Sequence, residues 1–228
     1  MTAESYKKIE DFMRSSMDEC AHDIEHVYRV LYNALIIAKD EKDANTDVVT
    51  AAALLHDTGR PEQLENPHLC HAQVGAKKAF GFLTANGFDE GFAKHVSDCI
   101  LSHRFRKDSP PKSIEAKILF DADKLDAVGA IGIARTLVYN GQTKRALYAL
   151  DENGSPVLRE ENSDDSFFRE YNYKLKKLYD NFYTDKGRAI AEERRKAAED
   201  FFNALCLEIE GPRKQSDIKD FITENINE

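Results

Sequence analysis

Apolar residues recur at helical spacing along nearly the whole chain, and this periodicity constrains the fold more than any other feature. In the segment 27–38, Val27, Val30 and Leu31 lie on one face of a helix, and residues 48–55 repeat the pattern. Alternation of apolar and polar residues, which indicates half-buried strands, is essentially absent. The sequence therefore predicts an all-α fold.

Turn-forming residues and charge patterns divide the chain further. Asn86-Gly87 ends a helix that we expect over residues 67–85. The stretch 139–159 contains glycines and a proline, and we expect a loop or a short hairpin there. Two long amphipathic helices rich in Lys, Arg and Glu are expected between Phe167 and Glu210, and a short helix from Gln215.

Composition excludes several classes of partner. The chain has 228 residues, with 32 Lys and Arg against 41 Asp and Glu, a formal charge of −9. This argues against a general surface for polymeric nucleic acid or anionic membranes, although a local basic pocket for a small anion is compatible with it. No apolar run approaches ~18 residues, and the first residues show no signal-peptide pattern. Four scattered cysteines without a CxxC pair suggest reduced thiols in a cytoplasmic protein: Cys20, Cys70, Cys99 and Cys206.

Ionisable side chains interrupt the apolar helix faces. His26, His56, His103 and Asp123 each lie three or four residues from apolar residues of the same predicted helix, and Asp57 follows His56 directly. Burying a carboxylate without a partner costs several kcal/mol, so the ionisable residues on these apolar faces require a binding partner. A divalent ion with neutral imidazole and carboxylate ligands would supply one, and His26, His56, Asp57 and Asp123 suit Mn, Mg, Fe, Co or Ni.

Periodicity leaves alternatives within this set. A single His on an apolar face is more often a hydrogen-bonded core residue than a ligand. His22 and His26 are four residues apart, so either could face inward. Asp121 competes with Asp123, because it lies on a neighbouring apolar stripe of the same helix.

Three motifs follow one another in a fixed order. The first reads His22-Asp23-Ile24-Glu25-His26, the second Leu54-Leu55-His56-Asp57, and the third Asp121-Ala122-Asp123-Lys124-Leu125-Asp126-Ala127, which continues to Arg135. This order resembles the HD superfamily of metal-dependent phosphohydrolases. The closer resemblance is to small bacterial HD hydrolases with a DADKLDAVGAIGIAR-like signature, and it covers roughly residues 21–150.

The resemblance implies both an architecture and a ligand set. It implies an HD-type metal-binding helical domain over residues 1–150 and a helical extension over 151–228 packed on it. The related (p)ppGpp hydrolases carry an A-D-R-L-H-N run that aligns with residues 122–127, which favours Asp123 over Asp121 and His26 over His22. One divalent ion is implied, because a further motif of the binuclear members is absent; a second ion is the lesser expectation.

The resemblance also implies roles around the ion. Asp126, or an unused oxygen of Asp57, would orient or deprotonate the attacking water. Lys124 would assist as a further catalytic group. His71 and His103 would contact water or substrate phosphate. Arg60, Arg104 and Arg135 would bind substrate phosphate, although each of these three could equally be a solvated charge on a helix surface.

The function implied is hydrolysis of a small phosphorylated substrate. A nucleotide is the first expectation, which makes the chain a nucleoside triphosphate pyrophosphohydrolase or a nucleotidase; cyclic nucleotides and (p)ppGpp come next. The alternatives are a non-catalytic HD-type nucleotide-binding or scaffold module, and oxygenase chemistry with two iron ions. The charged helices after Phe167 could form a homodimer contact, although such charge is more often a solvated face.

Overall fold

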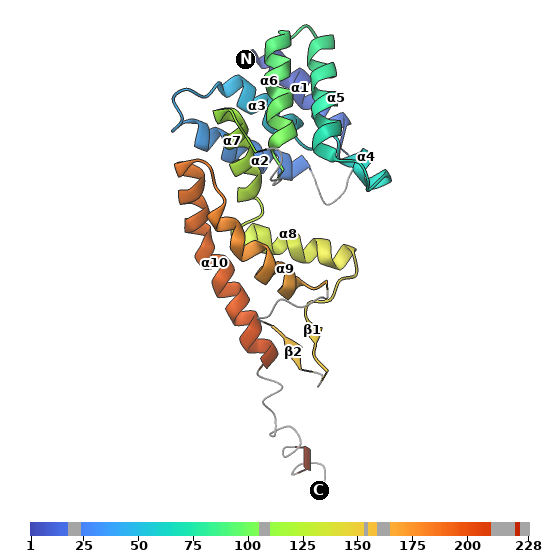
Figure 1. Cartoon of the computed structure of the whole chain (residues 1–228), viewed down its shortest axis with the longest axis vertical. Coiled ribbons are helices and arrows are strands. Elements are labelled where there is room, and N and C mark those ends of the chain that lie inside the picture. The colour runs from blue at the N-terminus through green and yellow to red at the C-terminus, as the bar shows by residue number, and fades with distance from the viewer. Residues whose placement is uncertain (18–23, 105–109, 153–154, 159–164, 211–221, 224–228) are drawn as a thin grey trace.

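The computed structural model describes residues 1–17, 24–104, 110–152, 155–158, 165–210 and 222–223 (Figure 1). His22 and Cys20 lie outside the described residues, as does nearly all of the tail helix expected from Gln215. The helices of the first part are α1 (Ala3–Ser15), α2 (Ile24–Ala38), α3 (Thr46–Leu55), α4 (Arg60–Glu65), α5 (His71–Ala85), α6 (Glu90–Ser102) and α7 (Ile114–Leu125). The second part contains α8 (Gly129–Gln142), β1 (Ala149–Leu150), β2 (Pro156–Val157), α9 (Phe167–Tyr173), the 3-10 helix η1 (Leu175–Asp180) and α10 (Asp185–Glu210).

Helix α3 lies in the middle of the first part. Its side chains from Val48 to Leu55 are buried except Thr50, and α1, α2, α6 and α7 pack around it. The helix begins where the Asn45 side chain accepts hydrogen bonds from the backbone of Asp47 and Val48. Small residues at Ala51, Ala52 and Ala53 allow this close packing, so the end of α3 is held rigidly inside the bundle.

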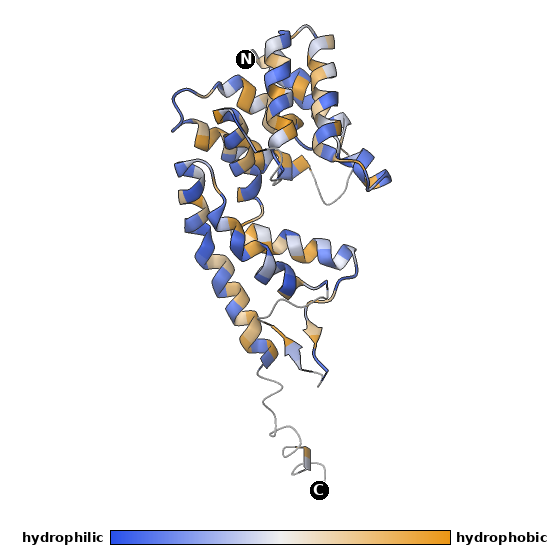
Figure 2. Cartoon of the chain, viewed as in Figure 1, coloured by the Kyte–Doolittle hydropathy of each residue, from blue (hydrophilic) through white to orange (hydrophobic). Residues whose placement is uncertain are grey.

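The second part has its own apolar core. Ile133 of α8, Phe167 and Phe168 of α9 and Phe202 of α10 pack together, and the Tyr171 and Phe202 rings stack with centroids 3.9 Å apart. Figure 2 shows α10 as hydrophilic over its first half and more apolar towards its end. A two-residue antiparallel hairpin, with Ala149 opposite Val157, lies at the edge of this part.

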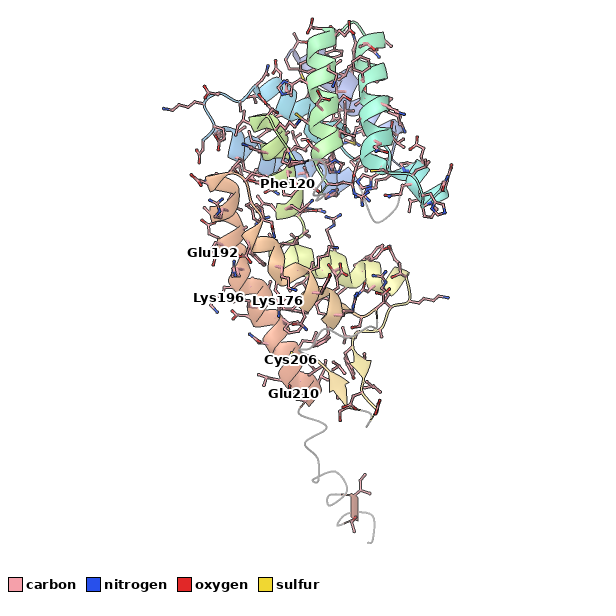
Figure 3. All side chains as sticks on the ribbon, in the orientation of Figure 1. Phe120, Lys176, Glu192, Lys196, Cys206 and Glu210 are labelled. Carbon is pink, nitrogen blue, oxygen red and sulfur yellow. The ribbon has the colours of Figure 1, made fainter. Side chains whose placement is uncertain are left out.

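Contacts from the second part hold α7 where the two parts meet. Asp121 of α7 is fully buried and accepts hydrogen bonds from the backbone of Tyr183 (2.9 Å) and from the backbone and hydroxyl of Thr184 (2.7 and 2.6 Å). Phe120 meets the Tyr183 ring edge-on at 5.0 Å, at the position labelled in Figure 3. The segment before α10 therefore fixes the position of α7.

The all-α class is confirmed, with one short hairpin in the described residues. The expectation of two long helices between Phe167 and Glu210 is wrong. Helix α9 has 7 residues, η1 follows it, and only α10, with 26 residues, is long. The reason is tertiary: Phe167, Phe168 and Tyr171 of α9 pack in the second core, whereas Tyr179 packs in the first core, so the chain changes direction between them. The described part contains no helix long and apolar enough to cross a membrane.

The hairpin expected in the stretch 139–159 is present, although α8 extends into this stretch as far as Gln142. The helix expected over 67–85 begins later, at His71. The predicted boundary between residues 150 and 151 falls at the end of β1, and it stays a prediction.

Candidate metal centre

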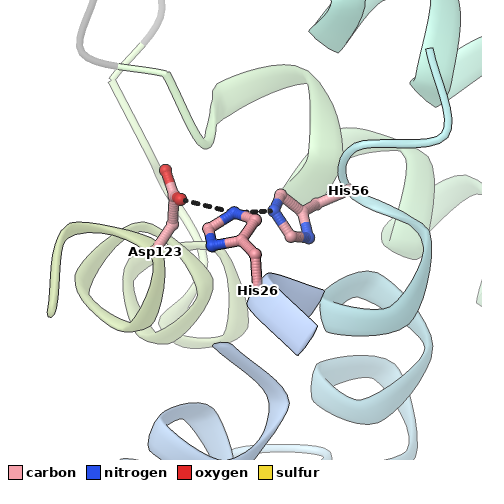
Figure 4. A group of neighbouring side chains, drawn as sticks. All are labelled: His26, His56 and Asp123. Carbon is pink, nitrogen blue, oxygen red and sulfur yellow. Dashed lines mark hydrogen bonds and ion pairs between the residues drawn. The ribbon is translucent and has the colours of Figure 1, made fainter. Parts of the chain in front are cut away.

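Four predicted ligands from different elements come together at one end of the first bundle. His26 lies in α2, His56 and Asp57 directly follow α3, and Asp123 lies in the last turn of α7. His26 Nε2 is 3.3 Å from His56 Nε2 and 3.5 Å from Asp123 Oδ1 (Figure 4). It is also 3.6 Å from Asp57 Oδ2. The structure thus brings together the whole set that the sequence proposed.

A second group of ligand-type atoms lies on the other side of Asp57. Its Oδ1 atom is 3.5 Å from His71 Nε2 and 3.8 Å from His103 Nε2. The two imidazole Nε2 atoms are themselves 3.3 Å apart. The ligand-type atoms thus form two groups, and within each group they lie within 4.8 Å of one another. The first group is His26, His56 and Asp123, and the second is Asp57, His71 and His103. Asp57 also contacts His26 of the first group, so it links the two.

All four histidines are oriented in the same way. Each Nδ1 lies within hydrogen-bond distance of an oxygen atom on the side away from the centre: His26 with Asp126 Oδ2 (2.7 Å), His56 with the Ala53 carbonyl (2.8 Å), His71 with Gln63 Oε1 (2.7 Å) and His103 with the Ile100 carbonyl (2.6 Å). Carbonyl and carboxylate oxygens only accept, so Nδ1 donates in these pairs and a neutral ring directs the lone pair of Nε2 into the centre. This is the arrangement of metal-binding imidazoles.

Burial favours the neutral form of three of these rings, those of His56, His71 and His103. It lowers the pKa of His56, lowers the pKa of His103 to about 4 and lowers the pKa of His71 to about 2. Two neutral nitrogen lone pairs that face each other across 3.3 Å in a buried site repel each other, and a cation between them removes that repulsion. The donor set therefore fits a divalent ion in each group.

The carboxylate of Asp123 remains charged. Burial raises the pKa of Asp123, but attraction to Lys124, and to the nearby imidazoles in their protonated form, lowers it well below its usual range. Lys124 Nζ is 2.7 Å from Asp123 Oδ2, and Arg60 Nε donates to Asp57 Oδ1 at 2.9 Å. Cationic side chains from α7 and α4 therefore flank the carboxylates of the centre.

The remaining predicted residues lie at different distances from the centre. Asp126 lies behind His26, and Arg135 of α8 contacts both of them. Arg104 points towards Cys70, with Nη1 3.6 Å from the sulfur. Asp121 lies outside the centre and anchors the start of α10, so in the structure Asp123, not Asp121, lies with the histidines.

Sequence reasoning missed two residues at this centre. Arg29 donates from Nε to Asp126 Oδ1 at 2.7 Å and from Nη2 to Asp126 Oδ2 at 3.1 Å. Its position three residues after His26 was a usable signal, because residues three apart share a helix face. Gln63, which orients His71, had no such signal, because it reaches the centre only through the path of α4.

Comparison with known proteins gives consistent results. The family model described as "HD domain" matches residues 23–128. The uncharacterized protein YpgQ of Bacillus subtilis is 31% identical over 198 residues, which cover 85% of this chain and 87% of YpgQ.

Solved structures are similar along most of the chain. The crystal structure of Bacillus subtilis YpgQ in complex with ADP has a TM-score of 0.70 and 28% identity, covering 90% of this chain and 97% of that one. An HD-superfamily hydrolase from Bacillus thuringiensis has a TM-score of 0.67 and 30% identity, covering 90% and 96%. A predicted HD superfamily hydrolase from an uncultured Thermotogales bacterium has a TM-score of 0.61 and 32% identity, covering 89% and 91%.

Proposed function

The chain belongs to the HD superfamily, and from this premise we propose that it is a metal-dependent hydrolase of phosphate esters or phosphoanhydrides. The substrate we propose is a nucleotide, which makes the protein a nucleoside triphosphate pyrophosphohydrolase or a nucleotidase. The observation that carries the proposal is the common orientation of the buried histidines, each with Nδ1 at an oxygen atom and Nε2 facing a carboxylate. The complex of YpgQ with ADP supports a nucleotide.

His26, His56, Asp57 and Asp123 would hold the divalent ion, whether Mn, Mg, Fe, Co or Ni. When bound, such an ion supplies a water of lowered pKa and a Lewis acid for the phosphoryl oxygens. We propose that these four residues hold one ion and that a second ion, if bound, lies among Asp57, His71 and His103. His71 and His103 are each 1% exposed, and this burial favours ligation of a second ion over direct contact with phosphate.

The chain's own groups would bind and orient the substrate. The side chain of Arg60 is 24% exposed and that of Lys124 is 15% exposed, so both reach solvent while they contact Asp57 and Asp123. Each can hold a phosphate oxygen beside the carboxylates and stabilise the charge that develops on the leaving group. Arg104 and Arg135 would contact phosphates farther from the reacting atom.

Turnover should be measured with Mn, Mg, Co, Ni and Fe against nucleoside mono-, di- and triphosphates, cyclic nucleotides and a general phosphodiester. We expect hydrolysis that EDTA abolishes and that added metal restores. His56→Ala should lose metal and activity together. His68→Ala is the matched control, because His68 is exposed and should keep both.

Two results would contradict the proposal. Unchanged metal content in His56→Ala would refute the ligand set. Nucleotide-induced thermal stabilisation without product under any metal would instead indicate a non-catalytic nucleotide-binding module.

A further inference from the structure

Asp126 is a buried carboxylate that lies behind the metal centre. It is 1% exposed and lies at the C-terminal end of α7, three residues after Asp123. Its Oδ2 atom is 2.7 Å from His26 Nδ1, on the side of the ring opposite to the centre. A proton on Nδ1 lets the ring donate to this carboxylate and leaves the lone pair on Nε2, where a metal ion would bind. In this tautomer Arg135 Nη1, which can only donate, donates to Asp126 Oδ2 and not to His26 Nδ1.

The same carboxylate also holds two arginines from different helices. Arg29 of α2 donates from Nε and Nη2, at 2.7 and 3.1 Å. Arg135 of α8 donates from Nη1 to Oδ2 at 2.5 Å and to the Asp126 backbone carbonyl at 3.3 Å. Two guanidinium groups on one carboxylate stabilise its charged form.

Both arginines also reach solvent next to His26. The side chain of Arg29 is 35% exposed and that of Arg135 is 23% exposed. Arg135 Nη1 is 3.0 Å from His26 Nδ1, so its guanidinium lies one imidazole ring away from the centre. A planar guanidinium has donors in two directions, and it can bind a carboxylate on one edge and a phosphate on another.

We propose that Asp126 is a positioning residue with two roles. It orients His26 for metal binding. It also holds Arg29 and Arg135 as a pair that binds those phosphate groups of the substrate that are distant from the reacting phosphorus. This inference rests on the proposed function for the identity of the substrate, but not for the metal-binding role. It assigns a phosphate-binding role to Arg29, and it differs from a role for Asp126 in contact with the attacking water.

The metal-binding half is tested with Mn²⁺ alone. Isothermal titration should show that Asp126→Asn binds Mn²⁺ about 10- to 100-fold more weakly than the wild type, because a neutral amide replaces the charged acceptor of the His26 Nδ1 proton. Glu115→Gln is the matched control: Glu115 is another buried carboxylate of α7, it bonds the backbone of Asn45, and its loss should leave Mn²⁺ affinity unchanged.

The position of the proton on His26 can be measured in the wild-type protein, so this test does not depend on whether a variant folds. Long-range ¹H–¹⁵N correlation spectra should show His26 with its proton on Nδ1. A proton on Nε2, or wild-type Mn²⁺ affinity in folded Asp126→Asn, would overturn the metal-binding half.

The phosphate half is tested with methylenediphosphonate, which is not hydrolysed. Its affinity for the Mn²⁺-loaded protein should fall about tenfold or more in Arg29→Gln and in Arg135→Gln, since each loses a charge-assisted hydrogen bond. Mn²⁺ affinity should stay within about threefold of wild type, because Asp126 remains in place. Unchanged diphosphonate affinity in both variants would overturn the phosphate half. A wild type that binds Mn²⁺ and diphosphonate but hydrolyses no phosphate compound would refute the proposed function and leave this inference standing.

Discussion

Asp121 and Asp123 lie two residues apart in α7, yet the structure gives them opposite tasks. Asp121 accepts three hydrogen bonds from Tyr183 and Thr184, whereas Asp123 faces His26. Asp121→Ala leaves two backbone N–H groups without their acceptor, at about 1–3 kcal/mol each. Burial raises the pKa of Asp121, so relief of its desolvation offsets part of this cost. We expect a net loss of about 2–4 kcal/mol in the free energy of unfolding.

The assay is urea unfolding of the metal-free protein, with Asp123→Ala as the matched variant. Asp123 pairs with Lys124, and both side chains keep some access to water, at 19% and 15% exposure. Its loss should abolish metal binding and should destabilise the metal-free protein less than the loss of Asp121 does, because Asp121 holds the segment before α10 whereas Asp123 pairs with its neighbour Lys124. An Asp121→Ala protein as stable as wild type, or an Asp123→Ala protein destabilised equally in the absence of metal, would refute this division of roles.

Three further variants test the surroundings of individual residues. A Cβ at Gly59 would lie 2.4 Å from the His71 carbonyl oxygen, so Gly59→Ala should displace α5 and lower the melting temperature, at a cost of about 1–3 kcal/mol in the free energy of unfolding. A Cβ at Gly81 in α5 would have nothing within 4 Å. Gly81→Ala should therefore stabilise the protein by about 0.5–1 kcal/mol. Burial raises the pKa of Glu115, but the hydrogen bonds that its carboxylate accepts outweigh burial and lower the pKa below 4.5. The hydrogen bond from the Asn45 backbone contributes most to this lowering. The stabilisation from Glu115 is therefore present above the unfolded pKa and lost as pH falls through the folded one. Acid titration of unfolding should show a shallower loss of stability in Glu115→Gln, and an unchanged slope would count against the contact.

The helical class and the first part of the fold were readable from the sequence because burial on one helix face leaves a period in the apolar residues. Helix α3 is the clearest case, since its N-cap Asn45 and its alanines are both local signals. The extent of α9 was not readable. Phe167 and Tyr179 belong to different cores, and no local pattern records which core an apolar residue joins.

The candidate site was predictable where an ionisable residue interrupts the apolar face of a predicted helix. His26, His56, Asp57 and Asp123 stood out as ionisable groups among apolar neighbours, and the order of motifs favoured one residue within each ambiguous pair. The contacts around them were not predictable in this way. The position of Arg29, three residues after His26, places it on the same helix face. Its contact with Asp126, 97 residues later in the chain, is made only by the fold.

The central claim is that two imidazoles and two carboxylates hold one divalent cation. The most direct measurement is anomalous diffraction at the manganese edge from crystals of the Mn²⁺-loaded protein. We expect a peak between His26 Nε2, His56 Nε2 and oxygens of Asp57 and Asp123, within coordination distance of all four side chains. A Mn²⁺ peak at other residues, or none at saturating Mn²⁺, would contradict the account.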